Sequence, residues 1–282
     1  MAGTRRLGYA KGAREELPMS VCRFNRALVR TPAASAVDGL RAVDRGAPDV
    51  AELRAEHAAY REALATAGVA VELLPALEAF PDSVFVEDPA LVFAPGAILL
   101  RPGAPTRIGE TAEIAPDLRL RFPVVLAMTG PGYADGGDVL VTPDTVYVGL
   151  SARTDRTGAA ELCDLLAEFG YRGIAVEPPA GVLHLKTACS LVADDCVLAT
   201  RAVADARLFD GLDVLVVPDG EEAVANALRV NETVMIADGF PRTRALLEER
   251  GYSVTVLKLD EVMKLDAGLS CMSLRWHDPA RP

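Results

Sequence analysis

The sequence predicts an α/β protein of about five similar units arranged radially around a common centre, each with two paired strands, a helix and a further strand. Paired strand-like runs joined by turn residues recur four times along the 282 residues. Several of these pairs are followed by a helical segment and another apolar strand, and the units recur roughly every fifty residues. A single doubly wound sheet is the alternative, but the chain lacks the Gly-rich phosphate loop that usually marks one.

The first unit lies near the N-terminus. Residues 26–31 and 69–74 have the apolar character of strands, and residues 48–67 between them are predicted to form a helix. Leu53, Tyr60 and Leu64 recur at helical spacing on one face of this segment. Gly68 is expected to end the helix, because glycine readily adopts the left-handed conformation found after a helix C-terminus.

Four strand pairs follow. The predicted pairs are residues 84–93 with 98–101, 139–142 with 145–150, 183–192 with 196–200, and 227–230 with 233–237. The turn residues between the members of each pair are Pro95-Gly96, Pro143-Asp144, Asp194-Asp195 and Asn231-Glu232. We therefore expect four hairpins.

Helices are predicted after three of these hairpins. Residues 154–169 form a helix that ends at Gly170, before a strand at 174–177. Residues 202–209 form a short helix. Residues 242–250 form a helix that ends at Gly251, before a strand at 253–257.

Composition narrows the class of protein. Half of the residues are hydrophobic, so the chain can bury a large core. The net charge of −11 argues against nucleic acid as a partner, because phosphates need a basic face, and it suits a cationic small molecule. No apolar run reaches membrane-spanning length and none near residue 1 resembles a signal peptide, so we expect a cytoplasmic protein without a membrane partner. The five scattered cysteines are expected to be reduced thiols.

Polar residues open several of the predicted apolar strands. They are Asp82, Glu87, Asp88, Asp135, Asp138, His184 and Cys271. In a radial arrangement these side chains would share one pocket at the axis. Crowded carboxylates favour a cationic ligand, and a guanidinium is the simplest one because it pairs with carboxylates through two parallel hydrogen bonds. A cysteine and a histidine far apart in sequence are also the usual source of an activated thiolate, although a free cysteine in an apolar strand is more often an inert core residue.

Sequence blocks spread over residues 26–276 resemble the dimethylarginine dimethylaminohydrolases, which belong to the guanidine-modifying (pentein) superfamily. The blocks are Val37-Asp-Gly-Leu40, Asp82-Ser-Val-Phe-Val-Glu87-Asp88, Arg101-Pro-Gly-Ala-Pro-Thr-Arg107-Ile-Gly-Glu110, Asp135-Gly-Gly-Asp138, Ser151-Ala-Arg153-Thr154, Val182-Leu-His184-Leu-Lys-Thr187, Val230-Asn-Glu232, Gly239-Phe-Pro-Arg-Thr243 and Leu269-Ser-Cys271-Met-Ser-Leu-Arg275. The resemblance implies a five-bladed α/β propeller (pentein fold) of pseudo-symmetric ββαβ units. It also implies a single catalytic domain over residues 26–282, with residues 1–25 as an extension that need not be ordered.

The resemblance also implies roles for individual residues. Cys271 would be the nucleophile, His184 the proton donor and acceptor, and Asp135 the carboxylate that orients His184. The substrate's guanidinium would bind to Asp82, Glu87 and Asp88, and its α-carboxylate to Arg107 and Arg153. Leu40, on a mobile lid, and Leu265 would line the pocket. The substrate would be a methylated arginine, no metal or cofactor would be needed, and a homodimer is compatible with the sequence.

The implied reaction converts asymmetric dimethylarginine to citrulline and dimethylamine through a thiouronium bound to Cys271. Alternative reactions are those of an arginine deiminase or of a hydrolase for another substituted guanidine. Typical arginine deiminases carry an extra helical domain for which this chain is too short. A guanidine-binding protein without turnover is the non-enzymatic alternative, but it would have no use for a reactive thiol.

Overall fold

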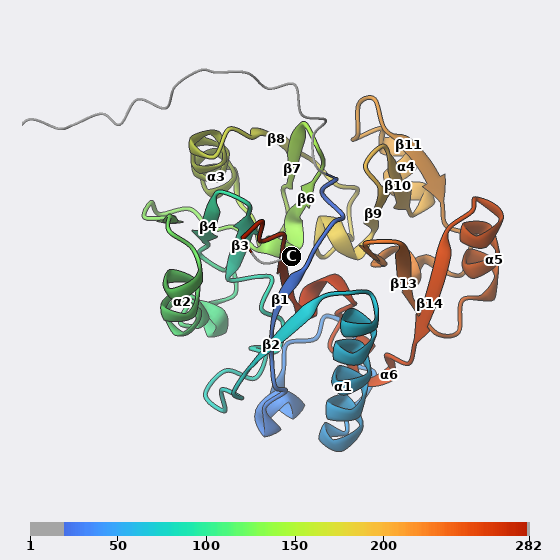
Figure 1. The fold of residues 1–282 in the computed structure, drawn as a ribbon, viewed down its shortest axis with the longest axis horizontal. Coiled ribbons are helices and arrows are strands. Elements are labelled where there is room, and N and C mark those ends of the chain that lie inside the picture. Colours follow the sequence, from blue (N-terminus) through green and yellow to red (C-terminus); the bar gives the residue numbers. More distant parts are fainter. Residues whose placement is uncertain (1–19, 281–282) are drawn as a thin grey trace, which may run out of the picture.

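The computed structural model describes residues 20–280 as five three-stranded sheets around a central axis, with helices at the periphery (Figure 1). The strands are β1 (Arg26–Arg30), β2 (Ala70–Leu74), β3 (Ala90–Phe93), β4 (Gly96–Leu99), β5 (Val125–Ala127), β6 (Val139–Val141), β7 (Thr145–Gly149), β8 (Arg172–Val176), β9 (Cys189–Ala193), β10 (Cys196–Ala199), β11 (Asp213–Val216), β12 (Leu228–Val230), β13 (Thr233–Ala237), β14 (Ser253–Leu257) and β15 (Leu274–Trp276). The helices are α1 (Val50–Thr66), α2 (Glu110–Arg121), α3 (Arg156–Glu168), α4 (Arg201–Ala206), α5 (Pro241–Glu249) and α6 (Asp260–Met263).

Every sheet has the same topology, and we call each sheet with its helix a blade. Blade 1 is β15-β1-β2, and blades 2 to 5 are β3-β4-β5, β6-β7-β8, β9-β10-β11 and β12-β13-β14. The inner pair of strands is antiparallel and the outer pair is parallel, with a helix in the crossover between the middle and outer strands. Blade 1 joins the two ends of the described chain, because β15 pairs with β1. The predicted five-bladed α/β propeller is confirmed.

The hydrophobic core lies between blades and under the helices. One cluster combines Phe93 and Ile98 of blade 2 with Val146, Leu162 and Leu166 of blade 3. Neighbouring blades thus bury each other's apolar faces.

Most predicted elements agree with the structure to within two residues, but two strands begin later than predicted. β3 begins at Ala90 rather than at residue 84, and β9 begins at Cys189 rather than at residue 183. The preceding residues form turns, in which Phe85 N donates to Asp82 O at 2.9 Å and Thr187 N donates to His184 O at 3.0 Å. Apolar residues in these turns resemble a strand in sequence because the blade interface buries them.

Helices α2 and α6 and strands β5 and β11 were not predicted from the sequence. Pro116 lies inside α2, where proline normally interrupts a helical pattern. The structure also describes residues 20–25 of the expected N-terminal extension. Phe24 N donates to Asn231 Oδ1 at 2.9 Å, so this short segment contacts blade 5. Residues 1–19 of the extension lie outside the described residues, and the domain boundary stays a prediction.

Trp276 tests how strongly blade closure stabilises the protein. Its side chain is 8% exposed, and its ring packs edge-on against Phe122 at a centroid distance of 5.2 Å. Truncating a buried aromatic residue typically costs about 3–5 kcal/mol. We expect Trp276→Ala to lower the free energy of unfolding by that amount, measured by urea unfolding with far-UV circular dichroism. Leu120→Ala is the control, since Leu120 is 81% exposed and its loss should change stability by less than about 0.5 kcal/mol. Equal effects would contradict this account of closure.

Candidate active site

Turns that precede the inner strands of the blades bring the predicted site residues together at one end of the axis. His184 directly precedes the 3₁₀ helix Leu185–Thr187, and Cys271 lies in the 3₁₀ helix Ser270–Met272. The prediction that these two residues open strands is therefore wrong. A turn lets several consecutive polar side chains face the axis, whereas a strand alternates their direction.

A small cavity of about 40 Å³ lies among these turns. It is lined by Leu40, Asp82, Phe85, Asp88, Arg107, Arg153, Leu183, His184, Leu265, Asp266, Ala267 and Cys271. All the predicted site residues are in this set except Asp135 and Glu87. The space holds few water molecules.

Asp135 lies behind His184 and is fully buried. Its Oδ2 is 3.1 Å from His184 Nε2, so the aspartate side chain is long enough to hold the imidazole. Burial lowers the pKa of His184. The hydrogen bond with Asp135 and the charges of Asp88, Asp138 and Asp135 outweigh burial and raise this pKa to about 9. His184 is therefore a cationic proton donor at neutral pH.

Asp138 anchors the His184 turn. Its Oδ1 accepts a hydrogen bond from Leu185 N at 2.8 Å, and its Oδ2 accepts hydrogen bonds from Ser151 at 2.6 Å and Thr154 at 2.7 Å. These bonds connect blade 3 to blade 4. Asp138 does not line the cavity, so its role is to position the His184 turn.

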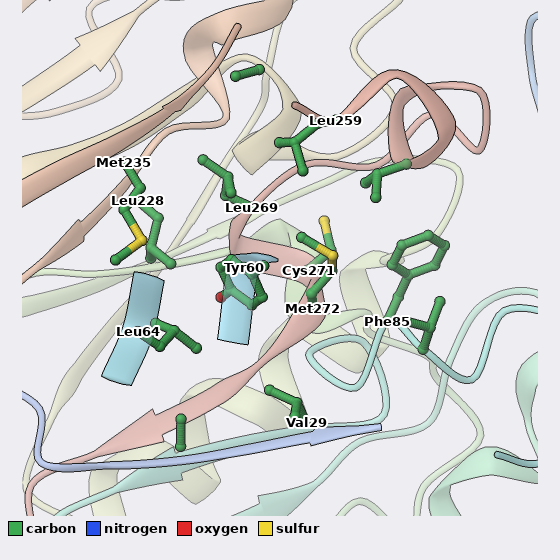
Figure 2. Close-up of a cluster of buried hydrophobic side chains, with 14 of the residues drawn as sticks. Val29, Tyr60, Leu64, Phe85, Leu228, Met235, Leu259, Leu269, Cys271 and Met272 are labelled. Atoms are coloured by element: carbon green, nitrogen blue, oxygen red, sulfur yellow. The ribbon is translucent and has the colours of Figure 1, made fainter. Parts of the chain in front are cut away.

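Cys271 lies at the border of an apolar cluster that includes Met272, Leu269 and Phe85 (Figure 2). Its side chain reaches the cavity, although the residue is only 7% exposed. Burial and the charges of Asp88 and Glu87 raise the pKa of the thiol to about 11. The resting cysteine is therefore a protonated thiol.

Asn226 contacts the nucleophile, and sequence analysis did not single it out. Its Nδ2 donates to Cys271 Sγ at 3.7 Å. Asn226 directly precedes the apolar run 227–230. In the other units, polar residues also lie just before the inner strand. This recurrence is the sequence feature that could have identified Asn226.

Arg107 is fully enclosed by acceptors. Its guanidinium forms ion pairs with Asp88 and Glu110 and donates to the backbone oxygens of Asp82 and Phe85. The ion pair with Glu110 uses both carboxylate oxygens, at 3.0 and 2.7 Å. Little of the hydrogen-bonding capacity of Arg107 is left for a substrate carboxylate in this conformation.

Asp88 and Asp82 present carboxylates to the cavity. Burial raises the pKa of Asp88, but the charges of Arg107 and His184 outweigh it, so the net shift is downward and Asp88 is ionised. The pKa of Asp82 is raised by burial. Asp82 Oδ1 accepts a hydrogen bond from Leu40 N at 3.0 Å, which holds the loop after Gly39 over the cavity.

Arg153 is more available than Arg107. Its side chain is 20% exposed, and its ion-pair contact with Asp135 is long, at 4.0 Å. Arg153 and the apolar side chains of Leu40 and Leu265 line the cavity. A cationic group and two apolar walls suit the amino-acid end of an arginine-like substrate.

Glu87 faces a different space. Its Oε1 forms an ion pair with Lys186 at 2.6 Å and accepts a hydrogen bond from Arg275 at 3.2 Å. The three residues line a second cavity of about 150 Å³. Glu87 is absent from the lining of the Cys271 cavity. The structure thus places Glu87 beside the site, where its charge acts on Cys271.

Asp88, Asp135 and His184 could together hold a cation, because their donor atoms lie within 4.8 Å of one another. Each already has a protein partner: Arg107 pairs with Asp88, and Asp135 pairs with His184. We therefore interpret this group as a hydrogen-bonded and ion-paired cluster.

Comparisons with known proteins agree with this geometry. The family model "N,N dimethylarginine dimethylhydrolase, eukaryotic" matches residues 47–237. The dimethylarginine dimethylaminohydrolase of Pseudomonas aeruginosa is 40% identical over 254 residues, which is 90% of this chain and 100% of that protein. The Streptomyces coelicolor protein of the same name is 34% identical, over 90% of this chain and 97% of the relative.

Solved structures give the same result. The P. aeruginosa enzyme, as a cysteine-to-serine mutant complexed with citrulline, superimposes with a TM-score of 0.87 at 39% identity, covering 90% of this chain and 99% of that chain. The N-terminal domain of ArgZ, an arginine dihydrolase of cyanobacteria, shares the fold with a TM-score of 0.78 at 17% identity, covering 89% of this chain and 96% of that chain. This chain belongs to the dimethylarginine dimethylaminohydrolase family.

Proposed function

We propose that this protein hydrolyses asymmetric Nω,Nω-dimethylarginine to citrulline and dimethylamine. The observation that carries the proposal is the shared cavity of Cys271, His184, Asp88 and Asp82, with His184 held by Asp135. Relatives named for this activity support it, as do related structures that hold citrulline or an S-methyl-L-thiocitrulline adduct.

The substrate's cation completes the electrostatics of the site. Asp88 is ionised and lines the cavity beside Cys271, so a guanidinium would bind there. The negative charge of Asp88 contributes to the raised thiol pKa of about 11. A bound cation offsets that charge and lowers the thiol pKa, so the substrate favours the thiolate that attacks it.

The reaction then follows two displacement steps. Cys271 loses its thiol proton to solvent as the cation binds, and its Sγ then forms a bond to the guanidinium carbon. The bond from that carbon to the dimethylamino nitrogen breaks, and His184 gives its proton to the departing dimethylamine. The product of this step is an S-alkylthiouronium. His184, now neutral, takes a proton from water as the oxygen attacks the same carbon. The carbon–sulfur bond breaks, its electron pair returns to Cys271, the remaining hydroxyl proton is lost to solvent, and citrulline is released.

The amino-acid end of the substrate is assigned to the outer part of the cavity. Arg153 would bind the α-carboxylate, and Arg107 would share this role only after giving up part of its pairing with Asp88. A cavity of about 40 Å³ is too small for a dimethylarginine molecule. We infer that the loop that carries Leu40 moves to admit the substrate, as a lid would.

Two further predictions concern location and assembly. Among residues 20–280, none of the helices is long and apolar enough to cross a bilayer. The five cysteines are free thiols, which supports the predicted cytoplasmic location. A homodimer stays a prediction from the sequence.

Substrate comparison tests the proposed activity. We expect citrulline from dimethylarginine, with dimethylamine as the second product, and none from the Cys271→Ser variant. Agmatine keeps the guanidinium but lacks the carboxylate that Arg153 would bind, so its kcat/KM should be about tenfold to a hundredfold lower, as expected for a lost charged hydrogen bond. Arg153→Gln should raise KM for dimethylarginine and leave agmatine turnover unchanged. Equal kcat/KM for agmatine and dimethylarginine would contradict the carboxylate assignment, and faster turnover of arginine would favour a deiminase.

The pH dependence of kcat tests the His184–Asp135 pair, because kcat reports the complex in which the bound cation has lowered the thiol pKa. In the unsubstituted protein, kcat should fall as the pH rises through the pKa of His184, which is about 9 in the unliganded site, because His184 then loses its proton. Asp135→Asn removes the hydrogen-bonded charge, so the pKa of His184 should fall. The high-pH limb of the profile, where activity is lost, should therefore move to lower pH by about one to three units. Asp144→Asn, at an exposed turn of the same blade, is the matched control. An unmoved limb in Asp135→Asn would show that Asp135 does not set the protonation of His184.

A further inference from the structure

Asn226 is the contribution of blade 5 to the end of the axis where the other blades place their polar turns. Blade 2 contributes Asp82 and Asp88, blade 3 Asp135, blade 4 His184 and blade 1 Cys271. Asn226 follows the 3₁₀ helix Glu222–Ala225 and precedes β12. It is 8% exposed, so a polar group at this position needs hydrogen-bond partners.

The hydrogen bonds of Asn226 fix the orientation of its amide. Ser270 N donates to Asn226 Oδ1 at 3.1 Å, and only the amide oxygen can accept this bond. The amide nitrogen must therefore point the other way, and it lies 3.7 Å from Cys271 Sγ. Gly268 packs against the same amide, since a Cβ atom on that glycine would lie 2.5 Å from Asn226 Cγ. The side chain is thus held on two sides.

The sulfur has a strong electrostatic need for such a donor. Burial and the charges of Asp88 and Glu87 raise its pKa, while a backbone hydrogen bond from Gly268 and the charge of Lys186 lower it. His184, a cation that also lines the cavity, must keep its proton for the leaving group. A neutral N–H donor can stabilise the thiolate and remain in place through the whole cycle.

We propose that Asn226 is a catalytic residue whose Nδ2–H donates a hydrogen bond to the Cys271 sulfur and stabilises the thiolate. The proposal rests on the proposed function and extends it. The thiolate occurs twice in each turnover, first as the nucleophile and again when the carbon–sulfur bond breaks. A donor that remains beside the sulfur stabilises both states, because sulfur accepts a hydrogen bond more strongly as a thiolate than as a thioether.

A purely structural role is the competing explanation, because Asn226 also holds the nucleophile turn through Ser270. Asn226→Asp separates the two roles. Aspartate keeps an oxygen that accepts from Ser270 N, but it replaces the donor beside the sulfur with a negative charge. Asn226→Ala removes both bonds, and Asn25→Ala is the control, since Asn25 bonds to Asp278 and does not line the cavity.

The experiment measures alkylation of Cys271 by iodoacetamide as a function of pH, with the labelled peptide quantified by mass spectrometry. The reagent is neutral and needs no substrate site, so its rate reports the thiolate fraction. We expect the thiol pKa to rise by about one unit or more in both Asn226 variants, with about tenfold slower alkylation at a fixed lower pH. The kcat for dimethylarginine should fall by a similar factor in both, and the control should match the unsubstituted protein.

Two results would overturn the proposal. One is a normal thiol pKa in both Asn226 variants. The other is normal alkylation and kcat in Asn226→Asp with loss only in Asn226→Ala, which would leave the structural role alone. Circular dichroism checks that each variant folds. If Asn226→Ala does not fold, the result for Asn226→Asp alone decides the test. Absence of citrulline formation by the unsubstituted protein would refute the proposed function instead, while the alkylation result would still decide the contact with the sulfur.

Discussion

The site depends on hydrogen bonds in which a buried side-chain oxygen of one blade accepts a backbone N–H from the next blade. Three such bonds join the turns around the axis: Gly137 N donates to Asp88 at 3.0 Å, Leu185 N to Asp138 at 2.8 Å, and Ser270 N to Asn226 at 3.1 Å. A buried polar group without a partner costs about 1–3 kcal/mol. The same bonds therefore satisfy the buried polar groups and set the relative positions of His184 and Cys271.

The electrostatics of the resting site follow from this arrangement. Carboxylates gathered at the axis raise the pKa of His184 to about 9 and contribute to the thiol pKa of about 11. The proton donor is thus ready, while the nucleophile is not. A guanidinium beside Asp88 changes this balance, so the site becomes reactive mainly when its cationic substrate is bound.

Sequence periodicity predicted the five blades because each unit repeats the same alternation of strand pair, helix and strand. It could not separate strand from turn at residues 84–89 and 183–188, where the blade interface buries apolar residues in turns. The sequence also could not show that the Glu87 side chain points away from the Cys271 cavity, because its direction depends on the partners Lys186 and Arg275 from other blades. The pairing of Arg107 with Glu110 illustrates the same limit, because charge type alone does not show which partner a buried arginine takes.

The central claim is that Cys271 forms a covalent bond to the guanidinium carbon while His184 serves both steps. Rapid acid quenching during turnover of dimethylarginine, followed by peptide mass spectrometry, tests it most directly. We predict an adduct with the mass of the substrate minus dimethylamine on the peptide that contains Cys271. A His184→Gly variant should form this adduct from dimethylarginine only slowly, because it cannot protonate the departing amine. Citrulline formation with no adduct on Cys271 in either protein, or an adduct on another cysteine, would contradict the account.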